Sequence, residues 1–302
     1  MNKKASFVLV SRDDNYCGDS LGRLTNTLNL LGERLSFFNK DVNSECILVE
    51  WGSNTLKNKL ILNNKIKKIL KIVEVPNVIS RKYQKDSPFS EVHAMNLGFK
   101  KSSGDFFIRI DQDTLVGDRF INWFFNEYHV DASVQWPEIA FSGRRDLSPD
   151  QSKNFLNIVT NQKENKKIPI THENHYFNKY TCVKNRFKFY GAAVGAIVIH
   201  KNLYNKHRGF NEDLIYMNNM DIEFINRICQ NNPIYNLGLD IENDFYHQYH
   251  DRVDAAMIST ESGEVIGKRK TNNIYYREFI SRGVNRDDWG LQNEDLNVFQ
   301  YE

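Results

Sequence analysis

The chain has 302 residues, which is enough for one sizeable hydrophobic core, and 40% of them are hydrophobic. Its 40 basic and 38 acidic residues nearly cancel to a formal charge of +2, which excludes a strongly basic surface that would grip nucleic acid. Aromatic residues reach 13%, which excludes a disordered chain.

The beginning of the chain runs straight into a short apolar segment, and no apolar run approaches the length of a signal sequence or a membrane span. Four cysteines are far apart and form no C-x-x-C pair, which favours four reduced thiols over a disulfide framework. They are Cys17, Cys46, Cys182 and Cys229. We therefore expect a cytoplasmic protein without a transmembrane segment, for which peripheral membrane contact stays open.

The first half of the chain alternates short apolar runs with amphipathic segments. Leucines at three- and four-residue steps between positions 21 and 35 form one apolar helix face, which Asp19 or Ser20 can cap. A second helix is expected around Val92, Met95 and Phe99. Strands are predicted over residues 7–10, 46–49, 69–75 and 106–110.

The second half is less regular. Between Gly143 and Gly191 the periodicity fades, and this stretch is interpreted either as a solvated surface excursion or as an acceptor-binding or lid segment. A strand over 192–199, a turn at Gly209 and a helix with an apolar face follow. Isoleucines 222, 225 and 228 form that face. The role of the last fifty residues stays open.

This order predicts an α/β domain with a mainly parallel sheet flanked by helices. We expect the domain to span 1–251, with a nucleotide-binding half over about 1–117 and an acceptor half over about 118–251, and a C-terminal extension over 252–302. Ligands of such sheets bind beyond the carboxyl ends of the strands. Glu50 and the pair Asp111 and Asp113 both follow predicted strands.

Asp111 and Asp113 are the first candidates for chemistry. Side chains at i and i+2 of extended backbone point the same way, so two carboxylates can converge on one cation. Carboxylate oxygens suit Mg²⁺ or Mn²⁺. The D-x-D pattern is common by chance, and its place directly after an apolar strand is what favours metal binding over a solvated turn.

Asp221 and two histidines are further candidates. Asp221 begins a predicted helix, where a carboxylate is often only a cap or a partner of the helix dipole. His247 and His250 lie in an aromatic stretch; imidazole binds Mn²⁺, yet two such rings can equally be packed and hydrogen-bonded.

The ordered set of these motifs resembles the GT-A glycosyltransferases, in particular the inverting family 2 with its chondroitin- and hyaluronan-polymerase-like members. The resemblance covers about residues 7–251. Two positions depart from the family pattern: Met220 stands where a Glu is usual, and Glu50-Trp51 stands where a pair of Asp is frequent. The matching segments are Val49–Ser53, His93–Gly98, Ser103–Asp105, Asp111–Asp113, Gly209–Glu212, Met220–Phe224 and Tyr246–Gln248.

The resemblance implies a role for each motif. Asp113 and His247 would bind Mn²⁺ or Mg²⁺, His250 would matter less, and Asp111 would reach the ribose or the metal through water. Asp221 would be the general base of an inverting transfer, with Glu212 as its rival and Glu223 as a weaker one. Further donor contacts are expected from Ser11, Arg12, Glu50, Arg81, Lys85, Asn96 and Arg109.

The expected partners are a nucleotide-sugar, with UDP favoured because Glu50 could accept the N3–H of uracil, and a glycan or glycoconjugate acceptor. Three alternatives stay open. A nucleotidyltransferase of related fold would need a glycine-rich phosphate loop where Ser11–Asp14 stands. A metal-dependent phosphohydrolase would need more clustered ligands. A non-catalytic sugar-binding or scaffolding protein could retain the same fold.

Overall fold

The computed structural model describes residues 3–131, 133–160, 194–216, 218–239, 241–242, 244–251 and 285–301, together with 170–171, 180–181, 257–259, 265–268, 270 and 272. Most of the lysine- and arginine-rich stretch between 143 and 191, expected to be a surface excursion or a lid, lies outside these residues, as does Cys182. No helix in the described part is both long and apolar enough to cross a bilayer.

Strands and helices alternate through the first half, as the sequence predicts. In chain order they are β1 (Ala5–Ser11), α1 (Ser20–Phe37), η1 (Asp41–Asn43), β2 (Ser44–Trp51), α2 (Leu56–Lys59), α3 (Asn64–Lys67), β3 (Leu70–Val75), α4 (Asn77–Gln84), α5 (Glu91–Lys101), β4 (Phe106–Ile110), β5 (Thr114–Val116) and α6 (Asp118–Asn126). Asp19 caps α1 by accepting a hydrogen bond from the backbone N–H of Gly22.

The second half completes the sheet. Its elements are β6 (Ile139–Asp146), α7 (Pro149–Lys153), α8 (Phe155–Thr160), β7 (Ile170–Thr171), β8 (Tyr180–Thr181), β9 (Val194–His200), α10 (Lys201–Lys206), α11 (Met220–Cys229), β10 (Ile234–Asn236), η2 (Leu237–Leu239), β11 (Phe245–His247), β12 (Met257–Ser259), β13 (Val265–Lys268) and β14 (Val298–Gln300).

The described strands form one large sheet in the order β14-β3-β2-β1-β4-β9-β6-β10-β8, with β12 and β13 as a separate pair. The strands β3, β2, β1 and β4 are mutually parallel, and β9 is antiparallel to both β4 and β6, so β6 continues the common direction. The mainly parallel α/β fold expected from the sequence is therefore confirmed.

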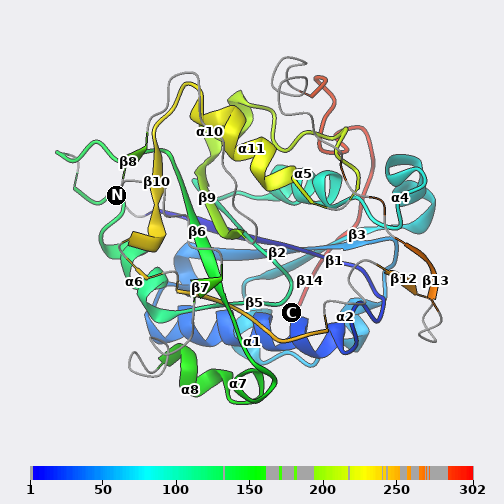
Figure 1. The fold of residues 1–302 in the computed structure, drawn as a ribbon, viewed down its shortest axis with the longest axis horizontal. Coiled ribbons are helices and arrows are strands. Elements are labelled where there is room, and N and C mark those ends of the chain that lie inside the picture. Colours follow the sequence, from blue (N-terminus) through cyan, green and yellow to red (C-terminus); the bar gives the residue numbers. More distant parts are fainter. Residues whose placement is uncertain are drawn as a thin grey trace.

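Helices cover both faces of the sheet (Figure 1). Alternate residues of β1 point to opposite sides. Phe7 and Leu9 pack in the core beneath α1, whereas Val8 and Val10 pack against α5 and α11. This double burial explains why β1 reads as a continuous apolar run, which is typical of parallel sheets.

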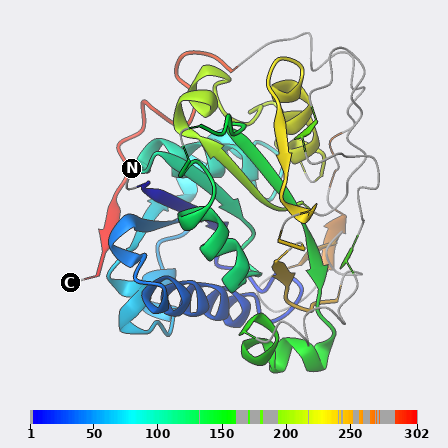
Figure 2. The ribbon, with the colours of Figure 1, turned by 90° about the vertical axis from the view of Figure 1, so that its left-hand side faces the viewer.

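The end of the predicted C-terminal extension belongs to the same sheet. β14 pairs antiparallel with β3 and forms the outer edge seen in Figure 2. Trp289 is 5% exposed and packs on Tyr204, and Lys100 lies over its ring. This segment therefore contributes to the packing of the domain.

Candidate metal centre and adjoining carboxylates

Strand pairing brings the D-x-D turn beside the predicted histidines. β4 ends at Ile110, and residues 111–113 turn into β5. β5 pairs antiparallel with β11, which places His247 opposite Thr114. The backbone N–H of Gln248 donates to the carbonyl of Asp113 at 3.0 Å. Two segments more than a hundred residues apart therefore meet at the carboxyl edge of the sheet.

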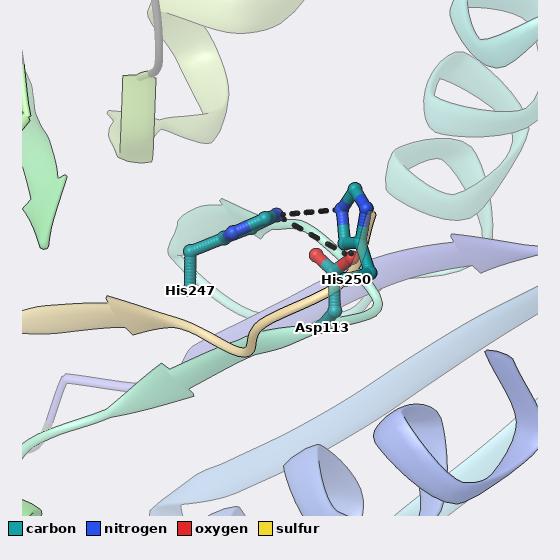
Figure 3. Close-up of side chains that lie close together, drawn as sticks. All are labelled: Asp113, His247 and His250. Atoms are coloured by element: carbon teal, nitrogen blue, oxygen red, sulfur yellow. Dashed lines mark hydrogen bonds and ion pairs between the residues drawn. The ribbon is translucent and has the colours of Figure 1, made fainter. Parts of the chain in front are cut away.

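Asp113, His247 and His250 form one cluster (Figure 3). The Nε2 atoms of both histidines lie 3.5 Å from Asp113 Oδ2, and they are 3.2 Å from each other. A point about 2 Å from all three atoms exists in this triangle, which is the bond length of a divalent first-row metal to nitrogen or oxygen. The spacing of the three donor atoms thus fits a metal ion.

Surrounding residues fix these side chains. Asp146, opposite His247 across β6 and β11, has its Oδ1 atom 3.3 Å from His247 Nδ1. Such a carboxylate orients a metal-bound imidazole from behind. Gln248 anchors the segment to α1 by donating to the carbonyl of Arg23 and to Thr27 Oγ1. The ring of Tyr16 packs on that of His250, with centroids 5.7 Å apart.

The protonation states of Asp113 and His250 are those in which these side chains can bind a metal ion. Burial raises the pKa of Asp113, but His247, His250 and Arg144 together outweigh burial and hold this pKa well below its usual range. Burial lowers the pKa of His250, which keeps that imidazole neutral. Burial also lowers the pKa of His247, but Asp113 and Asp146 together raise it more, so the net shift is upward and a proton there must leave before a metal binds.

Asp111 lies in a second cluster, centred on the guanidinium of Arg109. Arg109 is 4% exposed, and its Nη2 atom lies 2.6 Å from Asp111 Oδ1, 2.9 Å from Glu91 Oε1 and 3.6 Å from Asp221 Oδ2. Arg144 Nη1 lies 3.2 Å from Asp111 Oδ2. We call Glu91, Arg109, Asp111 and Asp221 the arginine cluster. It places Arg109 among carboxylates, and the contact of Arg109 with a diphosphate stays a prediction.

Asp221 is the acceptor-side carboxylate of this cluster. Its Oδ1 atom is buried and accepts no hydrogen bond from the described residues. Burial raises the pKa of Asp221, and Arg109 offsets only part of that shift. A carboxylate with a raised pKa and an unpaired oxygen is suited to accept a proton.

The two rival carboxylates are held by structural contacts. Glu212 Oε1 accepts from Asn96 Nδ2 at 3.0 Å and from the backbone N–H of Gly290 at 2.8 Å. Glu223 is 2% exposed and pairs with Arg227 at 2.6 Å. Of the three carboxylates considered as the general base, Asp221 is thus the one with a buried oxygen that no hydrogen bond from the described residues occupies.

The predicted donor contacts divide into two groups. Ser11 and Arg12 lie at the end of β1, where Ser11 Oγ donates to Gln112 Oε1 at 2.6 Å and Arg12 pairs with Asp14. Arg81 and Lys85 are exposed. These residues border the carboxyl edge of the sheet or its surface, and their contacts with a donor stay predictions.

Glu50 and Asn96 are buried and already bonded. Glu50 is fully buried, and its Oε1 atom accepts from Ser53 Oγ and the backbone N–H groups of Thr55 and Leu56. Its Oε2 atom accepts no bond from the described residues. Asn96 donates to the carbonyl of Phe210 at 2.9 Å. A contact between Glu50 and the nucleobase of a donor therefore requires the loop after β2 to move.

Sequence reasoning did not single out Glu91 or Asp146, and it expected His250 to matter less than His247, although both rings lie 3.5 Å from Asp113 Oδ2. Glu91 precedes the D-x-D by about twenty residues, and it reaches Arg109 of β4 from the start of α5, which packs on β1 and β2. Nothing local to these positions indicates a site. The spacing His247-x-x-His250 was a usable signal, since both rings lie close to Asp113.

Comparison with known proteins bears on the fold. No family model matches the chain, and no curated protein matches it by sequence. Among solved structures it is similar to S. aureus TarS 1-349, with a TM-score of 0.52 and 15% identity over 81% of this chain and 60% of TarS 1-349. It is similar to the UDP-GlcNAc complex of the same protein, with a TM-score of 0.51 and 16% identity over 85% of this chain and 62% of that one.

The chain thus spans about three fifths of the TarS fragment that it matches. At this level of identity the likeness concerns the fold. The chain has the GT-A architecture, as the order of its motifs indicated.

Proposed function

We propose that this chain is a metal-dependent glycosyltransferase that transfers a sugar from a nucleotide-sugar to a hydroxyl of a glycan or glycoconjugate. The observation that carries the proposal is the convergence of Asp113, His247 and His250 at the carboxyl edge of the sheet, next to Asp221 in the arginine cluster. One cluster supplies a cation site, and the other supplies a carboxylate for the acceptor.

Asp113, His247 and His250 would hold the ion. Two imidazoles and one carboxylate favour Mn²⁺ over Mg²⁺, because Mg²⁺ prefers oxygen ligands and water. When bound, such an ion stabilises the negative charge that develops on the leaving diphosphate. Asp146 keeps His247 oriented, and the contact between Gln248 and α1 keeps the histidine segment against the D-x-D turn.

Asp221 would take the proton from the acceptor hydroxyl as the new glycosidic bond forms. A single displacement requires a base on the face opposite the leaving group, and it inverts the anomeric centre. The metal-binding carboxylate is committed to the leaving-group side, so it cannot serve. The α11 backbone and Arg109 support Asp221 from two directions.

The donor is proposed to be a UDP-sugar. Two observations support this choice: Glu50 lies at the carboxyl end of β2 with one unbonded oxygen, and the similar TarS structure was determined with UDP and with UDP-GlcNAc. Calorimetry should give Mn²⁺-dependent binding of UDP that is tighter than that of GDP. Comparable or tighter GDP binding would contradict the assignment of uracil as the nucleobase of the donor.

The decisive test is UDP release from UDP-GlcNAc and other UDP-sugars, with a panel of acceptors, in the presence of Mn²⁺. Excess chelator and Asp113→Asn should each abolish turnover while the circular dichroism spectrum is retained. Full turnover in chelator would overturn metal dependence. Nucleotide binding without any turnover would favour the sugar-binding alternative.

A further inference from the structure

The segment that leads into α11 has an unusual backbone. Asn218 and Asn219 are consecutive residues with φ of 69° and 68°, in the left-handed region. Asparagine tolerates this region better than most residues, but two in succession are unfavourable without support. Asp221 follows two positions later, in the first turn of the helix. The direction in which Asp221 points therefore depends on how this segment is held.

Asn272, in the C-terminal part of the chain, holds it. Its Nδ2 atom donates to the carbonyls of Tyr216 at 2.6 Å and Asn218 at 2.8 Å, and more weakly to that of Leu214 at 3.4 Å. Its Oδ1 atom accepts from the backbone N–H of Tyr216 at 3.1 Å. Asn272 is only 5% exposed, so water does not readily replace these bonds.

Asn272 also binds the side chain of Asn219, the N-cap residue of α11. Asn219 is the N-cap of α11, yet its side chain makes no capping hydrogen bond. It donates instead to the backbone carbonyl of Asn272 at 2.9 Å. The start of α11 is thus fixed by a contact to a segment more than fifty residues away, where a cap normally fixes it locally.

We propose that Asn272 is a positioning residue for Asp221. It holds Asn218 and Asn219 in the left-handed conformation and so sets the first turn of α11, which carries the carboxylate. This inference rests on the proposed function for the role of Asp221. It assigns to the C-terminal part of the chain a role in catalysis, through the geometry of the acceptor side.

A neighbouring contact offers a matched control. Lys270 pairs with Asp86 and lies over the ring of Tyr216, whose hydroxyl donates to Asp86 at 2.6 Å. Lys270 and Asp86 are exposed, and exposed ion pairs contribute little. Lys270→Ala therefore alters the same part of the chain without touching the bonds of Asn272.

The experiment compares Asn272→Ala with Lys270→Ala, using UDP release from UDP-GlcNAc with Mn²⁺. Asn272→Ala should lower kcat by roughly 10- to 100-fold, because a small misplacement of a reacting group has that effect. The Kd of UDP with Mn²⁺ should change by less than about two-fold, because the donor side is not touched. Hydrogen exchange of the backbone in 214–222 should quicken in this variant. Lys270→Ala should stay near the wild type in all three.

Two substitutions in the loop sharpen the test. Adding Asn218→Gly to Asn272→Ala should recover part of the lost kcat, about five-fold, because glycine occupies the left-handed region without strain. Asn219→Gly keeps the backbone conformation and removes the bond to Asn272, so an intermediate loss of kcat is expected. This second variant carries the comparison if Asn272→Ala folds poorly.

Asp221→Asn is measured alongside to separate two kinds of failure. If Asp221→Asn is inactive but Asn272→Ala has normal kcat and normal exchange in 214–222, the positioning role is wrong. If Asp221→Asn retains turnover, the assignment of the base fails, while the exchange data still decide whether Asn272 holds the loop.

Discussion

The cluster of Asp113, His247 and His250, here called the metal cluster, lies at the same edge of the sheet as the arginine cluster. The two differ in which groups neutralise their carboxylates. In the metal cluster one carboxylate faces two imidazoles, whose nitrogens can bind an external cation once unprotonated. In the arginine cluster three carboxylates surround a guanidinium that belongs to the protein. A buried charge needs a partner, and the two clusters satisfy this need in opposite ways. We therefore propose that the first cluster binds a ligand ion and that the second holds the general base.

The largest effect is expected at the base. Asp221→Asn should lower kcat by about 10² to 10⁴-fold, the usual contribution of positioned proton transfer, with nucleotide affinity nearly unchanged. Steady-state kinetics and calorimetry measure the two quantities, and Glu212→Gln serves as the comparison. NMR of the anomeric product tests inversion separately. A retained configuration, or a larger loss in Glu212→Gln, would move the base elsewhere.

Removal of the central guanidinium should show that the second cluster needs its own cation. Arg109→Met leaves Glu91, Asp111 and Asp221 without their shared partner, and breaking a buried ion pair typically destabilises a protein by about 3 to 5 kcal/mol. Urea unfolding measures the change. Arg119→Met, which removes a more exposed pair with Glu242, should change stability by less than about 1 kcal/mol.

Arg109→Met also tests the comparison directly. Three partly buried carboxylates without their arginine resemble a cation site, so Mn²⁺ titration of the variant could reveal a second bound ion. Our expectation is a stoichiometry that rises from one to two in calorimetry, together with recovered stability in Mn²⁺. An unchanged stoichiometry of one would mean that Mn²⁺ does not replace the charge of the Arg109 guanidinium among the three carboxylates.

The two histidines should contribute comparably, since their Nε2 atoms are equally distant from Asp113. His247→Ala and His250→Ala should each weaken Mn²⁺ binding by more than about 100-fold, and Asp146→Asn by about 10-fold, in line with ligands and the groups that orient them. Electron paramagnetic resonance of Mn²⁺ measures free and bound ion, and His200→Ala is the histidine control. A small loss in His250→Ala alone would restore the order expected from the sequence.

The smallest effect concerns a carboxylate at the opposite end of the sheet. Burial raises the pKa of Glu45, but hydrogen bonds from Lys71, Ser6 and Ser103 outweigh it and lower this pKa to about 2. Because the folded pKa is depressed, the stabilisation is present above the unfolded value of about 4.5 and is lost as pH falls toward 2. Glu45→Gln should lower stability by roughly 1 to 2 kcal/mol at neutral pH.

That difference between Glu45→Gln and the wild type should shrink on acidification, as measured by urea unfolding between pH 7 and pH 2.5. Turnover per folded molecule should not change, because Glu45 lies away from both clusters. A constant difference at every pH would show that packing, and not the charge, accounts for the loss.

The sequence by itself determined the elements that carry the site. The apolar run 106–110 is buried on both faces, so it reads as a strand, and the D-x-D follows it directly. The apolar steps of α1 and α5 identify those helices for the same reason, because burial of one face imposes a local period. The α/β class and the position of Asp113 follow from such local patterns.

Only the tertiary structure decided which residues meet. The pairing of β5 with β11 puts His250 beside Asp113, and the packing of α5 on β1 and β2 puts Glu91 beside Arg109 of the neighbouring β4. The contact of Asn272 with the segment before α11 joins positions more than fifty residues apart. Such contacts depend on strand register and chain path through space, and these arise from the packing of the whole core, which no local period in the sequence records.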